Sequence, residues 1–516
     1  MSSHSTINFH DVLTSFQLDL SANLLDAQDI RQAFADAECD FGHQEHTVFN
    51  KATTLWAFLR EMLHMGTQRT LKAAVQDVQQ LRIAKGLDPN SASTGTYSSA
   101  RGKINTEVPR SLILTVAKNA ENIVPDEMRL CGLKVTIIDG TTHSMPDTKD
   151  NQEKYPQQKS QKAGLGFPLW RNIVLISAAT AMVLLAAVGP WSGKGTGELS
   201  LLVSLFHQLK TVANGIDVIV GDKYYCSYNL IAILRHFNIR FVTRLHGNRL
   251  IDFANADGVK RQENGDFHVT WCRPKRPFWM LDWMWNIVPK TMTLRLVRVR
   301  IDVPGSRPQG FFVVTNLMDA KAYPSEAIRE LYLGRWQIEV DLRTIKSFME
   351  LEILRGKTPE MVEKEFAMGL LAYNLVRAKM LETAMNVREE AAQRKRETPK
   401  KAEPEGKARK NKIEPEDMTA RNVSFSVALT SITASYVTTH FMSEAMRNVY
   451  RAQSEWNRRT VQVGNRPGRS EPRCNKRRPK QQRLMMEPRD VLRGQLIRGE
   501  SPTQTGDEAA MLLGEE

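Results

Sequence analysis

The chain has 516 residues, of which 41% are hydrophobic and 25% are charged. This length and balance exclude a wholly disordered or fibrous protein and leave room for two to four domains. The formal net charge is +14, and it is concentrated in two segments. Residues 451–500 carry 14 basic and 5 acidic side chains, and residues 391–412 carry 9 basic and 3 acidic ones. The rest of the chain is close to neutral, so we expect these two segments to hold a polyanionic partner.

Cysteine usage and the N-terminal residues bear on the cellular compartment. Five scattered cysteines include no C-x-x-C pair, which argues against a disulfide framework or a zinc finger and is typical of a reducing environment. The N-terminus has no basic stretch followed by an apolar run, so we expect no signal peptide. These features predict a cytoplasmic protein.

The first 125 residues are predicted to be helical. Apolar residues recur at helical spacing over residues 47–66 and again over 68–86. A turn-rich stretch then precedes a short polar helix that carries Arg101 and Lys103. This order is compatible with a helix-turn-helix whose last helix enters a DNA groove, and equally with a small helical bundle whose last helix is solvated.

From residue 130 to about 387, strands and helices alternate. Strand-like segments end near residues 140, 180, 189, 222 and 245, and helices are expected over 196–209 and 228–237. Residues 172–193 carry no charge and approach the length of a membrane span, but their β-branched composition and the Gly189-Pro190 break favour two buried strands. A tryptophan-rich, strand-like block at about 246–320 interrupts the pattern. After Pro324 a long helical run follows. We therefore predict an α/β domain with a β-strand-rich insertion.

The C-terminal quarter is predicted to hold little globular structure. Residues 388–420 are charged and poor in large apolar side chains, which indicates a low-complexity linker. Residues 421–516 comprise one helical segment followed by a basic, proline-containing tail. We expect the tail to bind phosphates without reading sequence.

Two aspartates stand at the ends of apolar strands. Asp139 closes VTIID and Asp222 closes VIVGD. Carboxylates at strand ends next to glycine are one way in which an α/β sheet presents ligands at its edge, although aspartate also commonly caps such a turn.

A third candidate element lies in the long helical run. Tyr332, Arg335, Glu339 and Lys346 are spaced by 3, 4 and 7 residues, which places them on one narrow face of a helix. A solvated helix face accounts for the same spacing. A glutamate between two cations and a tyrosine can also complete a metal site whose neighbours bind phosphate.

Together these residues resemble the DDE transposases of the insertion-sequence-four family, which includes the transposase of transposon five. The family pattern is an aspartate ending the first strand, an aspartate ending the fourth, and Tyr-x2-Arg-x3-Glu-x6-Lys. It is matched by Asp139 in IIDGTT, Asp222 in VGDKYY, and YLGRWQIEVDLRTIK. The resemblance covers about residues 130–385, and the first 125 residues share only their helical character. It implies a ribonuclease-H-like catalytic domain at 130–387, and the helix-turn-helix order suggests that residues 1–125 are a DNA-binding domain.

The resemblance also implies the chemistry. Asp139, Asp222 and Glu339 would hold two Mg²⁺ or Mn²⁺ ions for DNA cleavage and strand transfer, as carboxylate ligands suit these cations. Tyr332, Arg335 and Lys346 would hold terminal phosphates, and Trp336 would stack on a base, although a core tryptophan is as compatible with the sequence. Double-stranded DNA is the implied partner, and the protein would act as a homodimer associated with the bacterial nucleoid.

Other candidate residues are open to two interpretations. Lys223 follows Asp222 and either contacts phosphate or is simply exposed, and His143 either approaches the metal site or is structural. The tryptophans of the insertion either wedge DNA or pack a small β-domain. Neither a Ser/His/Asp arrangement nor a phosphate-binding G-x-x-x-x-G-K-[ST] loop is recognisable, so we expect no use of ATP.

Two other functions fit the same residues. A ribonuclease-H-like nuclease or resolvase would cut DNA without joining it. A protein derived from an inactive transposase would bind DNA only.

Overall fold

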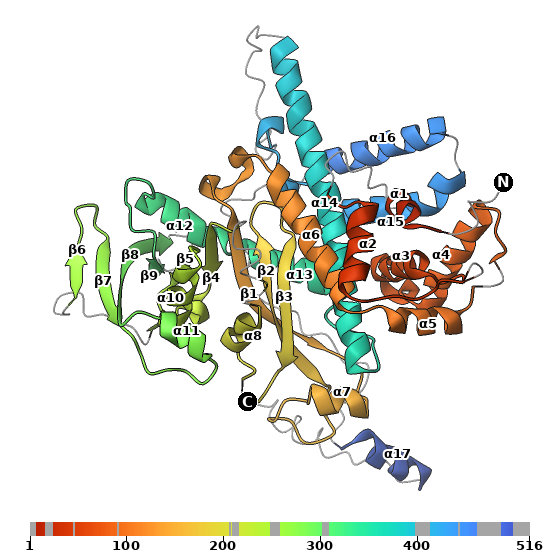
Figure 1. Cartoon of the computed structure of the whole chain (residues 1–516), viewed down its shortest axis with the longest axis horizontal. Helices are drawn as coiled ribbons and strands as arrows, with labels where there is room; N and C mark the ends of the chain where they lie inside the picture. The colour runs from red at the N-terminus through yellow and green to blue at the C-terminus, as the bar shows by residue number, and fades with distance from the viewer. Residues whose placement is uncertain are drawn as a thin grey trace, which may run out of the picture.

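The structure is a computed structural model of the whole chain (Figure 1). It describes residues 7–15, 24–44, 47–89, 92–193, 195–205, 208, 216–247, 258–301, 309–397, 413–441, 444–461 and 487–498. The basic tail lies for the most part outside the described residues, as does most of the charged segment after residue 397.

The N-terminal region is helical, as predicted. Its α-helices are α1 (Phe9–Ser15), α2 (Ala27–Asp36), α3 (Lys51–Leu63), α4 (Leu71–Ala84), α5 (Thr94–Lys103) and α6 (Glu107–Ile123). Side chains of Asp26, Asn50, Thr70 and Ser93 accept hydrogen bonds from backbone amides in the first turns of α2 to α5, which explains where these helices begin. In α5, the helix proposed for a DNA groove, Arg101 is engaged internally by an ion pair with Glu61 at 2.7 Å.

A nine-stranded mixed sheet forms the centre of the molecule, in the order β3-β2-β1-β4-β5-β9-β8-β7-β6. The first five strands are β1 (Val135–Ser144), β2 (Leu169–Ser177), β3 (Val183–Pro190), β4 (Val218–Gly221) and β5 (Arg240–Arg244). Strands β1, β2 and β3 pair antiparallel, whereas β4 lies parallel to both β1 and β5. The predicted α/β class is thus confirmed, and the arrangement is consistent with a ribonuclease-H-like DDE domain.

The uncharged stretch at 172–193 forms most of β2 and β3, as the strand interpretation predicts. Nearly all of its side chains in β2 are buried because the sheet is covered on both faces. Among the described residues, no helix has the length and hydropathy needed to cross a membrane.

The predicted β-rich insertion extends the central sheet rather than forming a sheet of its own (Figure 1). Strand β9 (Gln309–Thr315) pairs antiparallel with β5, and β8 (Thr291–Ile301), β7 (Phe267–Cys272) and β6 (Val259–Arg261) follow outward. One short helix, α11 (Asp282–Ile287), lies in the insertion. Trp271 is buried, while Trp283 is 39% exposed.

The helical run after Pro324 is interrupted, whereas the sequence predicts one continuous helix. It consists of α12 (Ser325–Gly334), α13 (Gln337–Arg343) and a π-helical turn at Thr344–Phe348. At the junction, the amides of Arg335 and Trp336 bond to carbonyls three residues earlier, at 3.1 and 3.2 Å. The backbone therefore tightens before α13 and widens after it, which hydrophobic periodicity does not reveal.

The longest helix, α14 (Pro359–Glu397), runs between the sheet and the N-terminal helices and projects beyond both (Figure 1). It continues ten residues into the segment predicted to be a linker. The C-terminal helical segment is divided in two, α15 (Phe425–Phe441) and α16 (Glu444–Thr460), and a last short helix follows. That last helix is α17 (Arg489–Ile497). The central region also contains three shorter helices, α7 (Lys149–Lys154), α8 (Glu198–Ser204) and α10 (Tyr228–His236).

Candidate active site

Asp139 lies midway along β1, an inner strand that is flanked by β2 and β4. Its backbone is opposite Val174 of β2, and the strand pairs with β4 on its other edge up to Ile137. The buried residues Ile137 and Ile138 precede it, and from Asp139 onward β1 becomes partly exposed. One carboxylate oxygen, Oδ1, accepts a hydrogen bond from the amide of Gly140 at 2.8 Å. The strand thus delivers this carboxylate to the edge of the core.

Asp222 directly follows β4, the parallel neighbour of β1. Its Oδ1 accepts a hydrogen bond from the amide of Tyr224 at 2.7 Å and caps the short 3-10 turn Lys223–Tyr225. The Thr243 hydroxyl of β5 donates to the Asp222 carbonyl at 2.5 Å. A strand end and a side-chain cap therefore hold this aspartate beside β1.

Glu339 belongs to α13, which contacts β1. Its Oε1 lies 3.6 Å from Nη2 of Arg335, and the guanidinium of Arg335 lies 5.8 Å from the ring centre of Tyr332. Lys346 lies in the π-helical turn, with Nζ 3.5 Å from Oε1 of Glu352. Despite the interrupted helix, this segment brings its cations and its glutamate to the same region.

A shallow hollow joins the strand and the helix. Asp139 and Gly140 line it from β1, and Glu339, Leu342 and Lys346 line it from the helical run. Asp139 and Glu339 are 200 residues apart in the sequence but face the same space. Asp222 does not line this hollow, but its charge acts on Asp139.

The electrostatic environment of Asp139 is unusual for an aspartate. The pKa of its carboxyl is raised from 3.8 to about 6, mainly by burial and also by the negative charges of Asp222 and Glu198. The hydrogen bond from Gly140 and the positive charge of Arg335 lower this pKa but do not offset the burial. A carboxylate held among like charges is one that a bound cation stabilises.

The donor set fits hard divalent cations, since it consists of carboxylates. In the part of the chain that the structure describes, however, no three His, Cys, Asp or Glu side chains are gathered closely enough to hold a metal ion. Asp222 caps a turn and Glu339 faces Arg335, so side-chain rotation is needed to bring all three acids onto one ion.

A fourth carboxylate lies at this end of the sheet and was missed by the sequence interpretation. Glu198, at the start of α8, packs against Gly140, and a Cβ atom added to Gly140 would lie 2.6 Å from Glu198 Oε1. Burial raises the pKa of Glu198, as does Asp222, whereas the Tyr225 hydroxyl and Arg171 lower it. In the sequence, an acidic residue in the first turn of a helix is unremarkable, so no local signal points to this contact.

The other predicted residues differ in their surroundings. Trp336 is 51% exposed, which argues against a core tryptophan. Lys223 is exposed, with Nζ 5.9 Å from the ring centre of Tyr224. His143 is 1% exposed, with Nδ1 2.5 Å from the carbonyl of Leu351, so the structural interpretation of this histidine is confirmed.

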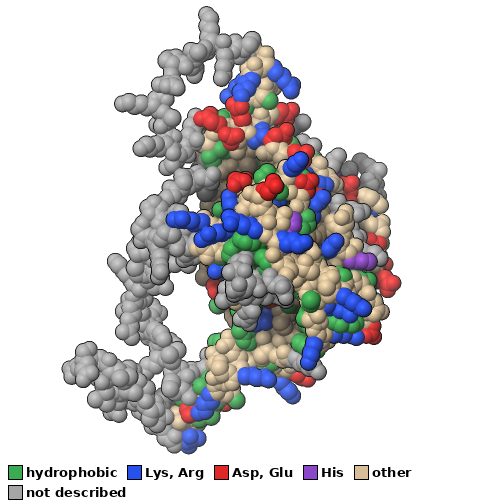
Figure 2. All heavy atoms as spheres, turned by 90° about the vertical axis from the view of Figure 1, so that its left-hand side faces the viewer, with side chains coloured by type: hydrophobic (Ala, Val, Ile, Leu, Met, Phe, Trp, Pro, Cys, Tyr) green, Lys and Arg blue, Asp and Glu red, His purple; other side chains and the backbone are tan. Residues whose placement is uncertain are grey.

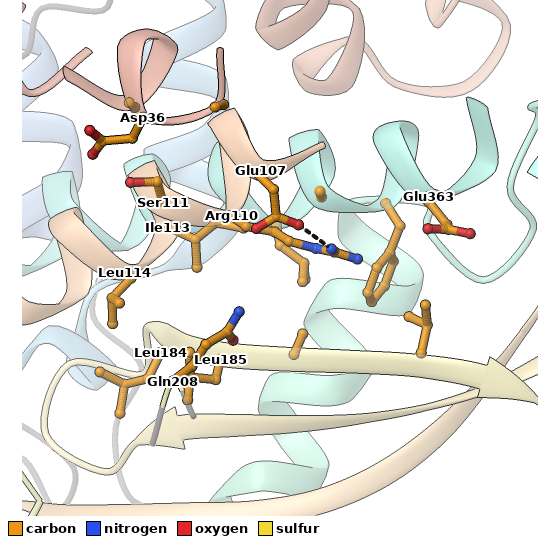
Figure 3. Close-up of a pocket in the computed structure, with 17 residues that line it drawn as sticks. Asp36, Glu107, Arg110, Ser111, Ile113, Leu114, Leu184, Leu185, Gln208 and Glu363 are labelled. Atoms are coloured by element: carbon orange, nitrogen blue, oxygen red, sulfur yellow. Dashed lines mark hydrogen bonds and ion pairs between the residues drawn. The ribbon is translucent and has the colours of Figure 1, made fainter. Parts of the chain in front are cut away.

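The described residues line two further cavities, one of which adjoins the hollow around Asp139 at Gly140. One, of about 640 Å³, begins at Gly140 and is lined by Glu198, Tyr224, Phe278 and Trp279, which places a tryptophan of the insertion beside the acids. The other, of about 330 Å³, lies between α2, α6, β3 and α14 (Figure 3). Its lining is mainly apolar, with the Glu107–Arg110 ion pair at its rim, and it shares no residue with the hollow around Asp139.

On one face of the molecule, the described Lys and Arg side chains are spread rather than gathered at one place (Figure 2). On the face that carries the insertion, Lys and Arg side chains alternate with acidic and apolar ones (Figure 2). This fits the near-neutral charge expected of the chain outside its two basic segments.

Comparison with known proteins identifies the region that holds these acids. Residues 131–375 match the family described as "Transposase DDE domain". The chain is 27% identical over 297 residues to "Transposase InsG for insertion sequence element IS4" of Escherichia coli (strain K12), an alignment covering 56% of this chain and 61% of that protein. It is also 27% identical over 158 residues to "Putative transposase y4zB" of Sinorhizobium fredii (strain NBRC 101917 / NGR234), covering 31% and 41%.

The mixed sheet, the aspartate within β1, the aspartate that follows β4 and the glutamate on α13 all lie within the region that matches the transposase DDE domain. Through this region the chain is similar to DDE transposases, among them the transposase of insertion sequence element IS4. The matched segments span less than two thirds of the length of either relative.

Proposed function

We propose that this protein is the transposase of an insertion sequence. It binds the terminal inverted repeats of the element, cleaves DNA there with divalent metal ions, and joins the freed ends to target DNA. The observation that carries the proposal is the shared hollow: Asp139 and Glu339 face one space beside Lys346, and the charge of Asp222 reaches Asp139.

Asp139, Asp222 and Glu339 are the residues that would hold the metal, two Mg²⁺ or Mn²⁺ ions. Bound there, such ions supply charge stabilisation for the attacking and leaving oxygens of a phosphodiester. The raised pKa of Asp139 supports this role, because an adjacent cation favours the ionised carboxylate that burial and Asp222 disfavour.

The cations around the hollow would hold DNA. Arg335 binds a phosphate through two parallel hydrogen bonds, and Lys346 contributes a point charge. Tyr332 positions Arg335, Lys223 contacts the backbone beside Asp222, and the exposed ring of Trp336 stacks on a base near the cut.

The reaction exchanges one phosphodiester bond for another. The oxygen of a water molecule first bonds to phosphorus, and the bond to the 3′ oxygen of the element breaks. The freed 3′-hydroxyl then attacks a phosphodiester of the target, with loss of its proton and departure of the target's own 3′ oxygen. The first step is a hydrolysis and the second replaces one phosphodiester bond by another of the same kind, so neither step needs ATP.

Joining two ends calls for two active sites, so we expect a homodimer in the complex with DNA. Since its substrate is chromosomal DNA, the enzyme would work in the bacterial cytoplasm at the nucleoid.

The proposal is tested by Mg²⁺-dependent nicking of a duplex that carries the element's terminal repeat. We expect Asp139→Asn, Asp222→Asn and Glu339→Gln each to abolish nicking while leaving the protein folded. Glu326→Gln is the matched control, since Glu326 precedes Glu339 in the same helical run and its side chain is 77% exposed. Its activity should equal that of the wild type.

The outcomes separate three functions. Nicking followed by transfer of the 3′ end to target DNA supports a transposase. Nicking without transfer would instead indicate a nuclease or resolvase on the same fold. If the purified protein binds DNA but never cuts it in Mg²⁺ or Mn²⁺, it is a DNA-binding protein derived from an inactive transposase.

A further inference from the structure

Helix α13 carries a second acid beside Glu339. Asp341 lies two residues further on, about 200° around the helix axis, so the two carboxylates point to nearly opposite sides. Glu339 faces the hollow, whereas Asp341 is fully buried, with 0% exposure. A buried carboxylate requires partners, and both of its oxygens have them.

The main partner comes from the C-terminal region, 80 residues further along the chain. Arg421 donates from Nη1 to Asp341 Oδ1 and from Nη2 to Oδ2, both at 2.9 Å. This is the two-bond geometry in which a guanidinium holds a carboxylate in a defined orientation.

The same guanidinium is bound to the central sheet. Its Nε donates to the carbonyl of Ala178 at 2.9 Å and its Nη2 to the carbonyl of Ser177 at 3.4 Å. Ser177 ends β2 and is paired with Thr136 of β1, the strand that carries Asp139. Arg421 therefore connects the strand pair that positions one acid to the helix that positions another.

A second arginine completes the site. Arg377 of α14 donates from Nη2 to Asp341 Oδ1 at 3.0 Å, and its guanidinium lies 5.1 Å from the ring centre of Tyr373 and 5.2 Å from that of Phe425. The Tyr373 hydroxyl donates to the carbonyl of Ala181, in the turn between β2 and β3. The C-terminal region thus supplies one charged partner of Asp341, Arg421, and packs on the other through Phe425.

The backbone around α13 explains why such an anchor matters. The helix has only seven residues, with a tightened junction before it and a π-helical turn after it. Its direction is therefore not determined by continuity with a longer helix. Contacts on its buried side decide where Glu339 points on its exposed side.

We propose that Arg421 is a positioning residue for Glu339, and that residues 413–433 are part of the catalytic unit rather than an appended segment. The inference rests on the proposed function. Through Asp341, Arg421 sets the orientation of α13 relative to β1, and with it the separation between Glu339 and Asp139 across the hollow.

The test compares two arginines of the C-terminal region in the full-length protein. Arg421→Met removes the link between α13 and the sheet. Arg458→Met is the matched control, because Arg458 is buried, as Arg421 is in part, and docks the same region, through Ser431 at 2.6 Å and Thr383 of α14 at 3.0 Å. None of its hydrogen bonds reaches α13 or β2.

Two quantities are measured for each variant: the Mg²⁺ concentration that half-saturates nicking, and Mn²⁺ binding followed by electron paramagnetic resonance in the presence of terminal-repeat duplex. We expect Arg421→Met to weaken both by about 10-fold or more, the usual effect of removing a group that orients a metal ligand. Arg458→Met should change neither, although both variants lower the thermal stability. If Arg421→Met does not fold, Arg421→Lys keeps the charge but not the two-bond geometry, and the same direction is expected.

The outcomes are distinct from those that test the proposed function. If the wild type neither binds Mn²⁺ nor nicks DNA, the proposed function itself fails. If the wild type is active and Arg421→Met has wild-type values, or if both variants weaken the metal dependence equally, Arg421 does not position Glu339 and the inference is overturned.

Discussion

The substitution Asp139→Asn should make the metal-free protein more stable above pH 6. The pKa of Asp139 is about 6 in the folded protein, against 3.8 for an ordinary aspartate. Between these values the folded state binds a proton that the unfolded state has released, so stability falls as pH rises through this range. Asparagine carries no charge at any pH and keeps an oxygen that can accept the hydrogen bond from Gly140. It therefore removes the penalty of the buried charge.

The size of the effect follows from the two pKa values. At 1.36 kcal/mol per pH unit, a difference of about two units corresponds to roughly 3 kcal/mol when the carboxyl is ionised in both states. The site is partly open to solvent, so we expect about 1–3 kcal/mol, which is a rise in Tm of roughly 2–8 °C for a domain of this size.

Thermal unfolding in EDTA at pH 8 and at pH 5 checks the prediction, with Glu326→Gln as the control. The stabilisation should be present at pH 8 and small at pH 5, where the wild-type carboxyl is already protonated. Millimolar Mg²⁺ at pH 8 should then stabilise the wild type but not Asp139→Asn, because a ligand stabilises only the protein that binds it. Equal Tm values at pH 8, or an equal difference at both pH values, would refute the assignment of a buried, strained charge to Asp139.

Three further predictions concern neighbouring residues. Arg335→Ala and Lys346→Ala should each weaken binding of terminal-repeat DNA about 10-fold while changing Tm little, because partly exposed ion pairs contribute only about 0–1 kcal/mol; unchanged affinity in gel-shift assays would contradict their role. Gly140→Ala should displace the carboxylate of Glu198 and slow nicking, and a wild-type rate would show that this contact is dispensable. His143→Ala should lower the free energy of unfolding by about 2–4 kcal/mol at pH 7, because the ring of His143 is buried and packs against Phe366 at 5.0 Å. Burial lowers the pKa of this histidine to about 4, so we expect a neutral, structural side chain and an unaltered Mg²⁺ dependence of the residual nicking. A shifted Mg²⁺ dependence would instead place His143 in the metal site.

Local patterns in the sequence were sufficient for the strands and for the candidate acids. Runs such as VTIID and VIVGD are apolar because the central strands are buried, so both strands are visible in the sequence; Asp222 follows the end of β4 as expected, whereas β1 continues past Asp139 to Ser144. The four spaced residues from Tyr332 to Lys346 were likewise visible, and the structure brings Glu339 and Lys346 to the hollow that Asp139 lines.

Patterns were insufficient where backbone geometry is set by neighbours. The periodicity from Ser325 to Phe348 is that of one helix, yet the chain tightens at Arg335 and widens at Thr344. Similarly, Arg101 lies on a polar helix that suggests a DNA contact, but its guanidinium pairs with Glu61 from another helix. The sequence shows that a side chain such as that of Arg101 is charged, but it does not show which carboxylate that side chain contacts in the folded protein.

The sequence by itself determined the α/β class of the central region and the candidate acids. Apolar strand-like runs and the spacing of charged residues are local properties, which can be recognised in a single sequence. Only the tertiary structure decided which side chains surround the acids. Glu198 reaches Gly140 across a β-strand connection, and Arg421 reaches Asp341 across 80 residues. Such contacts depend on how helices and strands pack against one another, and residues that meet in this way have no fixed spacing in the sequence.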